Sequence, residues 1–203
     1  MRERNIAIKK TLEKFSITIF SIEELGKIVS YGVYNLNNNM GFVNVGTSHD
    51  TSEFAVESIF RWWESVGKHT FPNSKKICVT CDSGGSNGCS VRMWKYQLQQ
   101  FVNRIGVGVE VSHFLCGASK WSKVEYRLFC YVSKSWQGKS LVGVQAVVDL
   151  IGVTKTVIGF EVVCVGDDIV YEFVRKVIDE GYGSILIDKI EPFEVWNYKI
   201  RPA

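Results

Sequence analysis

The chain has 203 residues, enough for one substantial hydrophobic core, and its 46% apolar and 13% aromatic content is typical of a globular protein rather than a disordered one. It contains no run of about 18 apolar residues and no signal-peptide pattern, so we expect a soluble, cytoplasmic protein without a membrane-spanning helix. Six scattered cysteines lack the spacing of a disulfide framework, which fits a reducing compartment.

The net charge of +3 is unevenly distributed along the chain. The segment from Phe60 to Ser140 holds 12 Lys and Arg against 4 Asp and Glu, whereas the remainder is net acidic. A basic segment of this kind favours a polyanionic partner such as DNA. An ordinary solvated surface explains such a count about as often, so charge alone does not decide between them.

The first predicted elements lie within residues 1–46. An irregular or helical arm is predicted for residues 1–26, because residues 1 to about 14 are polar and charge-rich, with a weak helical pattern and no pattern of a core element. Residues 27–203 are expected to form one domain. Two β-rich segments, 28–34 and 41–46, flank an asparagine-rich stretch that tolerates left-handed backbone, which predicts a hairpin.

A helix is predicted directly after the hairpin. Asp50-Thr51-Ser52-Glu53 has the form of a capping box, and apolar residues recur behind it at helical spacing. This favours a helix cap over a catalytic role for Asp50. An apolar strand at 77–81 then leads Asp82 into a glycine-rich run. The remaining predicted elements are a helix at 94–105 closed by Gly106, a strand at 107–114, helices at 119–129 and 141–151, and a mixed segment at 152–203.

Two carboxylates are notable because both are expected among apolar neighbours. Asp82 ends a buried strand, and Glu125 shares a helix stripe with Trp121, Leu128 and Phe129. A buried carboxylate is destabilising unless a cation meets it. Acidic oxygen ligands without a histidine cluster favour magnesium or manganese over zinc. Two such ions about 4 Å apart can activate an attacking oxygen and stabilise the leaving oxygen in phosphodiester exchange.

Two alternatives remain for these residue types. Glu125 could instead pair with a neighbouring cation such as Lys123, although Arg127 at i+2 points to another face of the helix. Cys78 and Cys81 form a C-x-x-C, but on a strand they point to opposite faces, which makes a structural zinc the minor interpretation. The other plausible zinc ligands are Cys89, His113 and Cys116.

A series of short motifs extends from about Phe20 to Pro202. They are Tyr31-Gly32-Val33-Tyr34, Gly41-Phe42-Val43-Asn44-Val45-Gly46, His49-Asp50-Thr51, Arg61-Trp62-Trp63, Asp82 with Gly84-Gly85-Ser86-Asn87-Gly88, Trp94-Lys95, His113-Phe114, Ser119-Lys120-Trp121, Glu125, Arg127-Leu128-Phe129 and Trp196-Asn197-Tyr198. With these motifs the chain resembles the DDE transposases of bacterial insertion sequences, specifically the Rhodopirellula-type transposase DDE domain (the ISAzo group).

The resemblance implies an RNase H-like core that cuts and joins DNA strands with two divalent ions, Mg²⁺ or Mn²⁺, held by two aspartates and a glutamate. Asp82 matches the second aspartate and Glu125 the glutamate, 43 residues further along the chain. The first aspartate belongs on the opening strand, and nothing before Lys27 matches that strand. The resemblance therefore predicts an α/β fold, namely an RNase H-like mixed sheet flanked by helices but lacking the opening strand, in an N-terminally truncated transposase.

This sequence also departs from the family pattern in two other ways. It has no counterpart of the family's N-terminal helix-turn-helix, and it differs at several single positions. The family usually has Asp at the position of Asn35, prolines within 115–118 and His at the position of Tyr126. Because one metal-binding carboxylate is missing, we expect weakened metal binding and strand cleavage near background.

The predicted partner is DNA, meaning insertion-sequence ends and target, and full-length transposase subunits are a further candidate. One alternative is a non-catalytic remnant that binds DNA or a transposase subunit. Another is an unstable product whose sheet has unpaired edges. The basic residues expected to contact phosphates are Arg92, Lys95, Lys120, Lys123 and Arg127.

Overall fold

The structure is a computed structural model that describes residues 17–22, 26–115, 122–136, 143–156, 159–173 and 175–203. For Ile17–Ile22, Lys27 and Glu125 it describes the backbone alone. Within the described part of the chain, no helix has the length and apolar character needed to cross a membrane.

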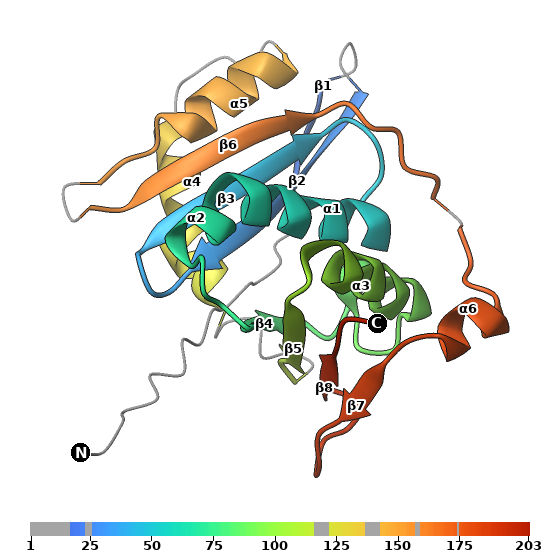
Figure 1. Cartoon of the computed structure of the whole chain (residues 1–203). Coiled ribbons are helices and arrows are strands. Elements are labelled where there is room, and N and C mark those ends of the chain that lie inside the picture. The colour runs from blue at the N-terminus through green and yellow to red at the C-terminus, as the bar shows by residue number, and fades with distance from the viewer. Residues whose placement is uncertain (1–16, 23–25, 116–121, 137–142, 157–158, 174) are drawn as a thin grey trace, which may run out of the picture.

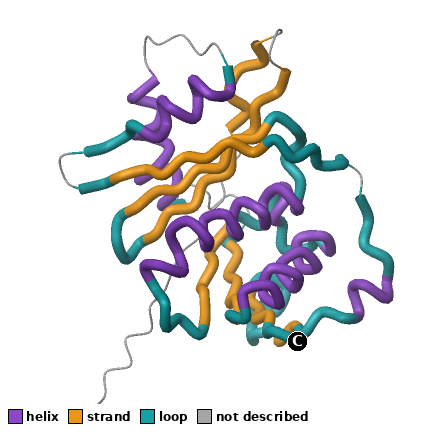
Figure 2. Tube along the Cα trace, turned by 45° about the horizontal axis from the view of Figure 1, so that its top comes forward, coloured by secondary structure: helices purple, strands orange, loops and turns teal. Residues whose placement is uncertain are grey.

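Two mixed four-stranded sheets flanked by helices make up the α/β fold (Figures 1 and 2). The first has the order β1-β2-β3-β6 and the second the order β4-β5-β8-β7. The strands are β1 (Ile17–Ile22), β2 (Gly26–Asn35), β3 (Met40–Gly46), β4 (Lys76–Cys81), β5 (Gly108–His113), β6 (Glu161–Asp167), β7 (Ile187–Lys189) and β8 (Asn197–Ile200).

The predicted hairpin is confirmed in β2 and β3. The two strands pair antiparallel from Val29 opposite Gly46 to Asn35 opposite Met40. Asn39 in the turn between them has a positive φ of 55°, a conformation that asparagine tolerates better than most residues. β6 then pairs parallel with β3 and extends the sheet on its other side.

The prediction of an irregular or helical arm is wrong for Ile17–Ile22, which forms β1 and pairs antiparallel with β2. Its sequence, ITIFSI, is rich in β-branched and aromatic residues, a composition that suits a strand. Pairing also satisfies backbone groups along the edge of β2. The strand contains no Asp or Glu, so it does not supply the first aspartate that the resemblance implies.

Helices begin and end close to the predicted residues. α3 ends at Gly106, whose φ of 66° is the left-handed conformation of a C-terminal cap, as predicted. The helix predicted at 119–129 is an exception: Ser122 is not helical, and the helix begins at Lys123 and continues beyond the predicted end to Trp136, while Ser119, Lys120 and Trp121 lie outside the described residues. The helical segments are α1 (Ser52–Trp62), the π-helical η1 (Trp63–Gly67), α2 (Lys68–Thr70), the 3₁₀ turn η2 (Gly85–Asn87), α3 (Arg92–Ile105), the π-helical η4 (Glu125–Phe129), α4 (Cys130–Trp136), α5 (Val144–Gly152) and α6 (Asp179–Gly183).

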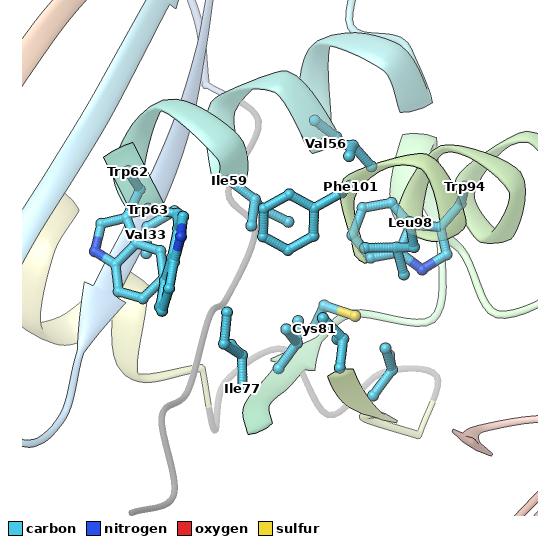
Figure 3. Close-up of a cluster of buried hydrophobic side chains, with 14 of the residues drawn as sticks. Val33, Val56, Ile59, Trp62, Trp63, Ile77, Cys81, Trp94, Leu98 and Phe101 are labelled. Carbon is cyan, nitrogen blue, oxygen red and sulfur yellow. The ribbon is translucent and has the colours of Figure 1, made fainter. Parts of the chain in front are cut away.

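One hydrophobic core joins the two sheets beneath α1 and α3 (Figure 3). Trp62 and Trp94, from these two helices, are among the largest fully buried side chains. Burying an aliphatic or aromatic side chain contributes about 1.5–3 kcal/mol. Ile77, Val79 and Cys81 point into this core from one face of β4, so the core fixes the strand that leads to Asp82.

A second core lies on the opposite face of the first sheet, beneath η4, α4 and α5. Leu128 and Phe129 pack there against the glycines of β2 and β3. A Cβ atom at Gly32 would lie 2.7 Å from the Phe129 ring, and one at Gly41 would lie 2.5 Å from Leu128 Cδ1. The absence of side chains at these two positions therefore allows η4 to lie directly on the sheet.

Candidate functional site

Asp82 is the first residue after β4, at the edge where parallel strands end. β4 and β5 run parallel, and Cys81 pairs with His113 at their carboxyl ends. Polar side chains that follow such strands gather at one edge of a sheet, where ligands commonly bind. Asp82 is half-buried there, as the apolar strand before it predicts.

The glycine-rich run after Asp82 forms a closed turn rather than an open, flexible loop. The amide of Gly88 donates to the carbonyl of Gly85 (3.1 Å), and the amide of Cys89 donates to the carbonyl of Ser83 (3.2 Å). Gly85 has a φ of 71°, which glycine adopts without strain. The turn therefore holds the chain that leaves Asp82 in one path.

Asp50 lies at this turn and does not cap α1, which corrects the sequence interpretation. The N-cap is Thr51, whose Oγ1 accepts from the amide of Phe54 (3.2 Å). Asp50 instead accepts a hydrogen bond from the Ser86 hydroxyl (2.8 Å), and the Ser52 hydroxyl donates to the Ser86 carbonyl. The beginning of α1 is thus tied to the turn that follows Asp82.

The electrostatics around Tyr31 indicate that acidic groups converge here. Burial raises the pKa of Tyr31 well above its usual value, and Cys81, Asp50 and Asp82 raise it further. Asp50 and Asp82, which lie on different loops, thus both act electrostatically on one buried phenol. Carboxylate oxygens are the donors that Mg²⁺ and Mn²⁺ prefer, so this donor chemistry fits a hard divalent cation.

His113 makes several polar contacts beside Asp82. Its Nδ1 lies 3.0 Å from the main-chain carbonyl oxygen of Asp82 and 3.3 Å from Cys81 Sγ. Its Nε2 lies 3.1 Å from the Tyr198 hydroxyl, which accepts from Trp94 Nε1 at 2.9 Å. Burial lowers the pKa of His113, which favours its neutral form.

Of the candidate zinc ligands, Cys81 and His113 lie in contact with each other. Cys81 is buried beside His113, whereas Cys78 lies on the other face of β4, as strand alternation predicts. Cys116 lies outside the described residues. Where the structure describes side chains, it contains no group of three or more His, Cys, Asp or Glu residues arranged to hold a metal ion.

Glu125 is the first residue of η4, but its side chain is outside what the structure describes. Its convergence with Asp82 therefore stays a prediction. Leu128 and Phe129 are buried, as the predicted stripe requires, and Arg127 is exposed on another face. Trp121 lies outside the described residues.

The five basic residues predicted to contact phosphates differ in their surroundings. Arg92 pairs with Asp179 at 2.5 Å, and its guanidinium lies over the ring of Tyr182. Lys95 is half-buried with Nζ 5.2 Å from the centre of the Tyr198 ring, and burial lowers its pKa. Lys120 lies outside the described residues, while Lys123 and Arg127 are exposed on either side of Glu125 in the sequence.

Sequence reasoning missed the contacts among Trp94, His113 and Tyr198. All three occur in the ordered motifs, but they lie on α3, β5 and β8. No local pattern reveals that segments so far apart in sequence meet beside Asp82. Their presence in three separate motifs was the available signal.

Comparison with known proteins adds one finding. The sequence model of the family described as Rhodopirellula transposase DDE domain matches residues 5–202, nearly the whole chain. No curated protein and no solved structure gives a significant match.

Proposed function

Because the chain belongs to the family of the Rhodopirellula transposase DDE domain, we propose that it serves metal-dependent cleavage and transfer of DNA strands in insertion-sequence transposition, with Asp82 and Glu125 as metal ligands. The observation that carries this proposal is the position of Asp82 at the carboxyl end of a buried parallel strand, with a closed turn behind it. Membership of the family makes DNA the expected partner.

The residues of the chain would have distinct roles in metal binding and DNA binding. Asp82 and Glu125 would supply carboxylate oxygens to Mg²⁺ or Mn²⁺, and Lys123 and Arg127 would hold DNA phosphates. When bound, the divalent ions would activate the attacking oxygen and stabilise the leaving oxygen. The tie between Asp50 and Ser86 would keep the turn behind Asp82 from moving as DNA binds.

Cleavage by the 203-residue chain on its own is proposed to lie near background. The first aspartate of the family pattern has no match before Lys27, and β1 contains no acidic residue. Two carboxylates offset less of the charge of two divalent ions than three would, which weakens metal binding.

The metal assignment is tested by Mn²⁺ titration followed by electron paramagnetic resonance. We expect Asp82→Asn to weaken binding at least tenfold, because the amide oxygen lacks the charge that a divalent ion requires. The control is Asp188→Asn, which changes a carboxylate on β7 that pairs with Arg201. Its Mn²⁺ affinity should match that of wild type. Equal affinities for wild type and Asp82→Asn would contradict the assignment.

Low intrinsic cleavage is tested by incubating the purified chain with supercoiled plasmid and Mg²⁺. We expect no nicking above background in wild type or in Asp82→Ala. Robust Mg²⁺-dependent nicking that Asp82→Ala abolishes would contradict this part of the proposal while supporting the metal assignment.

A second candidate function is a non-catalytic module that binds DNA or a transposase subunit. It is favoured by the exposure of Lys123 and Arg127, for which the described residues contain no ion-pair partner. DNA binding that survives chelation of divalent ions and is unchanged in Asp82→Asn would select this candidate.

A further inference from the structure

Three side chains from different elements meet behind Asp82, on the side where its main-chain carbonyl lies. Trp94 and Tyr198 are fully buried, and His113 is 7% exposed. Buried polar groups of this kind must satisfy one another, because water cannot reach them. Their hydrogen bonds can therefore be assigned from donor and acceptor chemistry.

The direction of each hydrogen bond follows from the groups at the two ends. The carbonyl oxygen of Asp82 can only accept, so His113 Nδ1 must carry a proton. At the other end, the indole of Trp94 can only donate, so the oxygen of Tyr198 accepts from it. In neutral His113 the remaining nitrogen, Nε2, is an acceptor, and the Tyr198 hydroxyl donates to it.

The contacts fix the main chain on both sides of Asp82. The carbonyl of Cys81, which precedes Asp82, accepts from the amide of Phe114 at 2.8 Å. The carbonyl of Asp82 itself is held by His113 Nδ1 at 3.0 Å. With both neighbouring peptide groups held, the direction of the Cα–Cβ bond of Asp82 is set, and the side-chain torsions then determine where the carboxylate lies.

We propose that His113 is a positioning residue for Asp82: its Nδ1–H fixes the Asp82 carbonyl, while Tyr198 and Trp94 fix the orientation of its ring. The inference rests on the proposed function in one respect only, namely that the ligand bound by the Asp82 carboxylate is a divalent cation. The hydrogen-bond chain itself is a property of the fold. A carboxylate whose main chain is already fixed loses less conformational entropy when it binds its ion.

The tautomer is tested first by long-range ¹H–¹⁵N correlation NMR of the full chain. We expect a protonated Nδ1 and an unprotonated Nε2 for His113. Tyr198→Phe removes the hydroxyl that donates to Nε2, so the Nε2 signal should shift, while Nδ1 keeps its proton toward the Asp82 carbonyl. Tyr96→Phe removes a hydroxyl from the same helix as Trp94 and should leave the His113 signals unchanged. A wild-type His113 with its proton on Nε2 would overturn the proposal.

Two substitutions at His113 separate positioning from packing. In His113→Asn the amide nitrogen lies near the place of Nδ1 and can still donate to Asp82. In His113→Gln the amide lies near the place of Nε2, where it can meet Tyr198 but not Asp82. Both variants lose the ring, so a purely structural role predicts equal behaviour.

We expect the amide signal of Ser83, which shares its peptide group with the Asp82 carbonyl, to stay near wild type in His113→Asn and to shift in His113→Gln. Mn²⁺ affinity should fall by about threefold at most in His113→Asn and by about tenfold in His113→Gln. Equal Ser83 shifts in the two variants would overturn the positioning role. If wild type shows no Asp82-dependent Mn²⁺ binding, the metal proposal fails, while the Ser83 signal still decides the role of His113.

Discussion

At the last residue of β6, the carboxylate of Asp167 is buried within a polar network that ties four segments together. It accepts hydrogen bonds from Arg61 Nη2 (2.9 Å), Asn44 Nδ2 (3.0 Å) and the Tyr171 hydroxyl (2.8 Å), and from the amide of Ile169 (3.1 Å). A buried charge is tolerated when it has a cationic partner and its oxygens accept hydrogen bonds. Removing one residue of such a network leaves the other buried polar groups without that partner, at the full cost of their desolvation. The network therefore holds β6 to β3 and α1.

Replacing Asp167 with Ala should lower the free energy of unfolding by about 3 kcal/mol, because Arg61, Asn44 and Tyr171 would lose their common acceptor. Asp168→Ala removes the exposed carboxylate next along the chain and should change stability by no more than about 0.5 kcal/mol. Urea unfolding of the two variants measures the difference. Similar losses in both would show that the network does not stabilise the fold.

At the scale of the elements, local sequence patterns predict structure where an element's own residues determine it. The hairpin, the 77–81 strand, the 94–105 helix and its Gly106 cap all have such patterns, and each lies close to its predicted range. The composition of β1 suits a strand, but its pairing with β2 could not be predicted, because pairing depends on a partner strand. For the same reason the division into two sheets was not predicted.

The same distinction applies to the candidate site. Asp82 was found from its own surroundings, an apolar strand before it and glycines after it. The N-cap was placed at Asp50 rather than Thr51, because the sequence does not show that Ser86 offers Asp50 a better partner. The sequence offers His113 as a candidate zinc ligand and as part of a family motif, but it does not show the contacts with Asp82 and Tyr198, which lie on other segments.

The contact between η4 and β2 depends on Gly32. Gly32→Ala would place a methyl group 2.7 Å from Phe129 Cε2 and 3.0 Å from Leu128 Cδ2, so we expect a loss of about 1–3 kcal/mol in stability and a displaced η4. Since Glu125 begins η4, Mn²⁺ affinity should fall as well. Gly166→Ala is the matched strand control, because its Cβ would lie 3.8 Å from the nearest atom, Val148 Cγ2. Unchanged stability and metal affinity in Gly32→Ala would contradict this packing argument.

At the scale of the whole molecule, the uneven charge distribution should be visible in how DNA binding depends on salt. The central segment is basic, and within it Arg92 is already paired with Asp179 and Lys95 is half-buried against Tyr198. Lys123 and Arg127 are exposed beside Glu125, so we expect these two of the predicted phosphate contacts to meet DNA. Each phosphate contact contributes about 0.9 to the slope of log K against log salt.

Replacing Lys123 and Arg127 together with Ala should therefore reduce the magnitude of that slope by about 1.8. The control replaces Lys155 and Lys199 with Ala, which removes the same formal charge. These two lysines pair with Glu161 and Glu110 and do not lie on the helix that carries Glu125. Fluorescence anisotropy of a labelled duplex in increasing KCl measures both slopes. If net charge alone governs binding, the two double variants will show equal slopes, and the assignment of DNA contacts to the helix that carries Glu125 will be wrong. A reduction confined to the Lys123 and Arg127 variant places the DNA backbone beside η4, where a strand-cleaving site that uses Glu125 requires it.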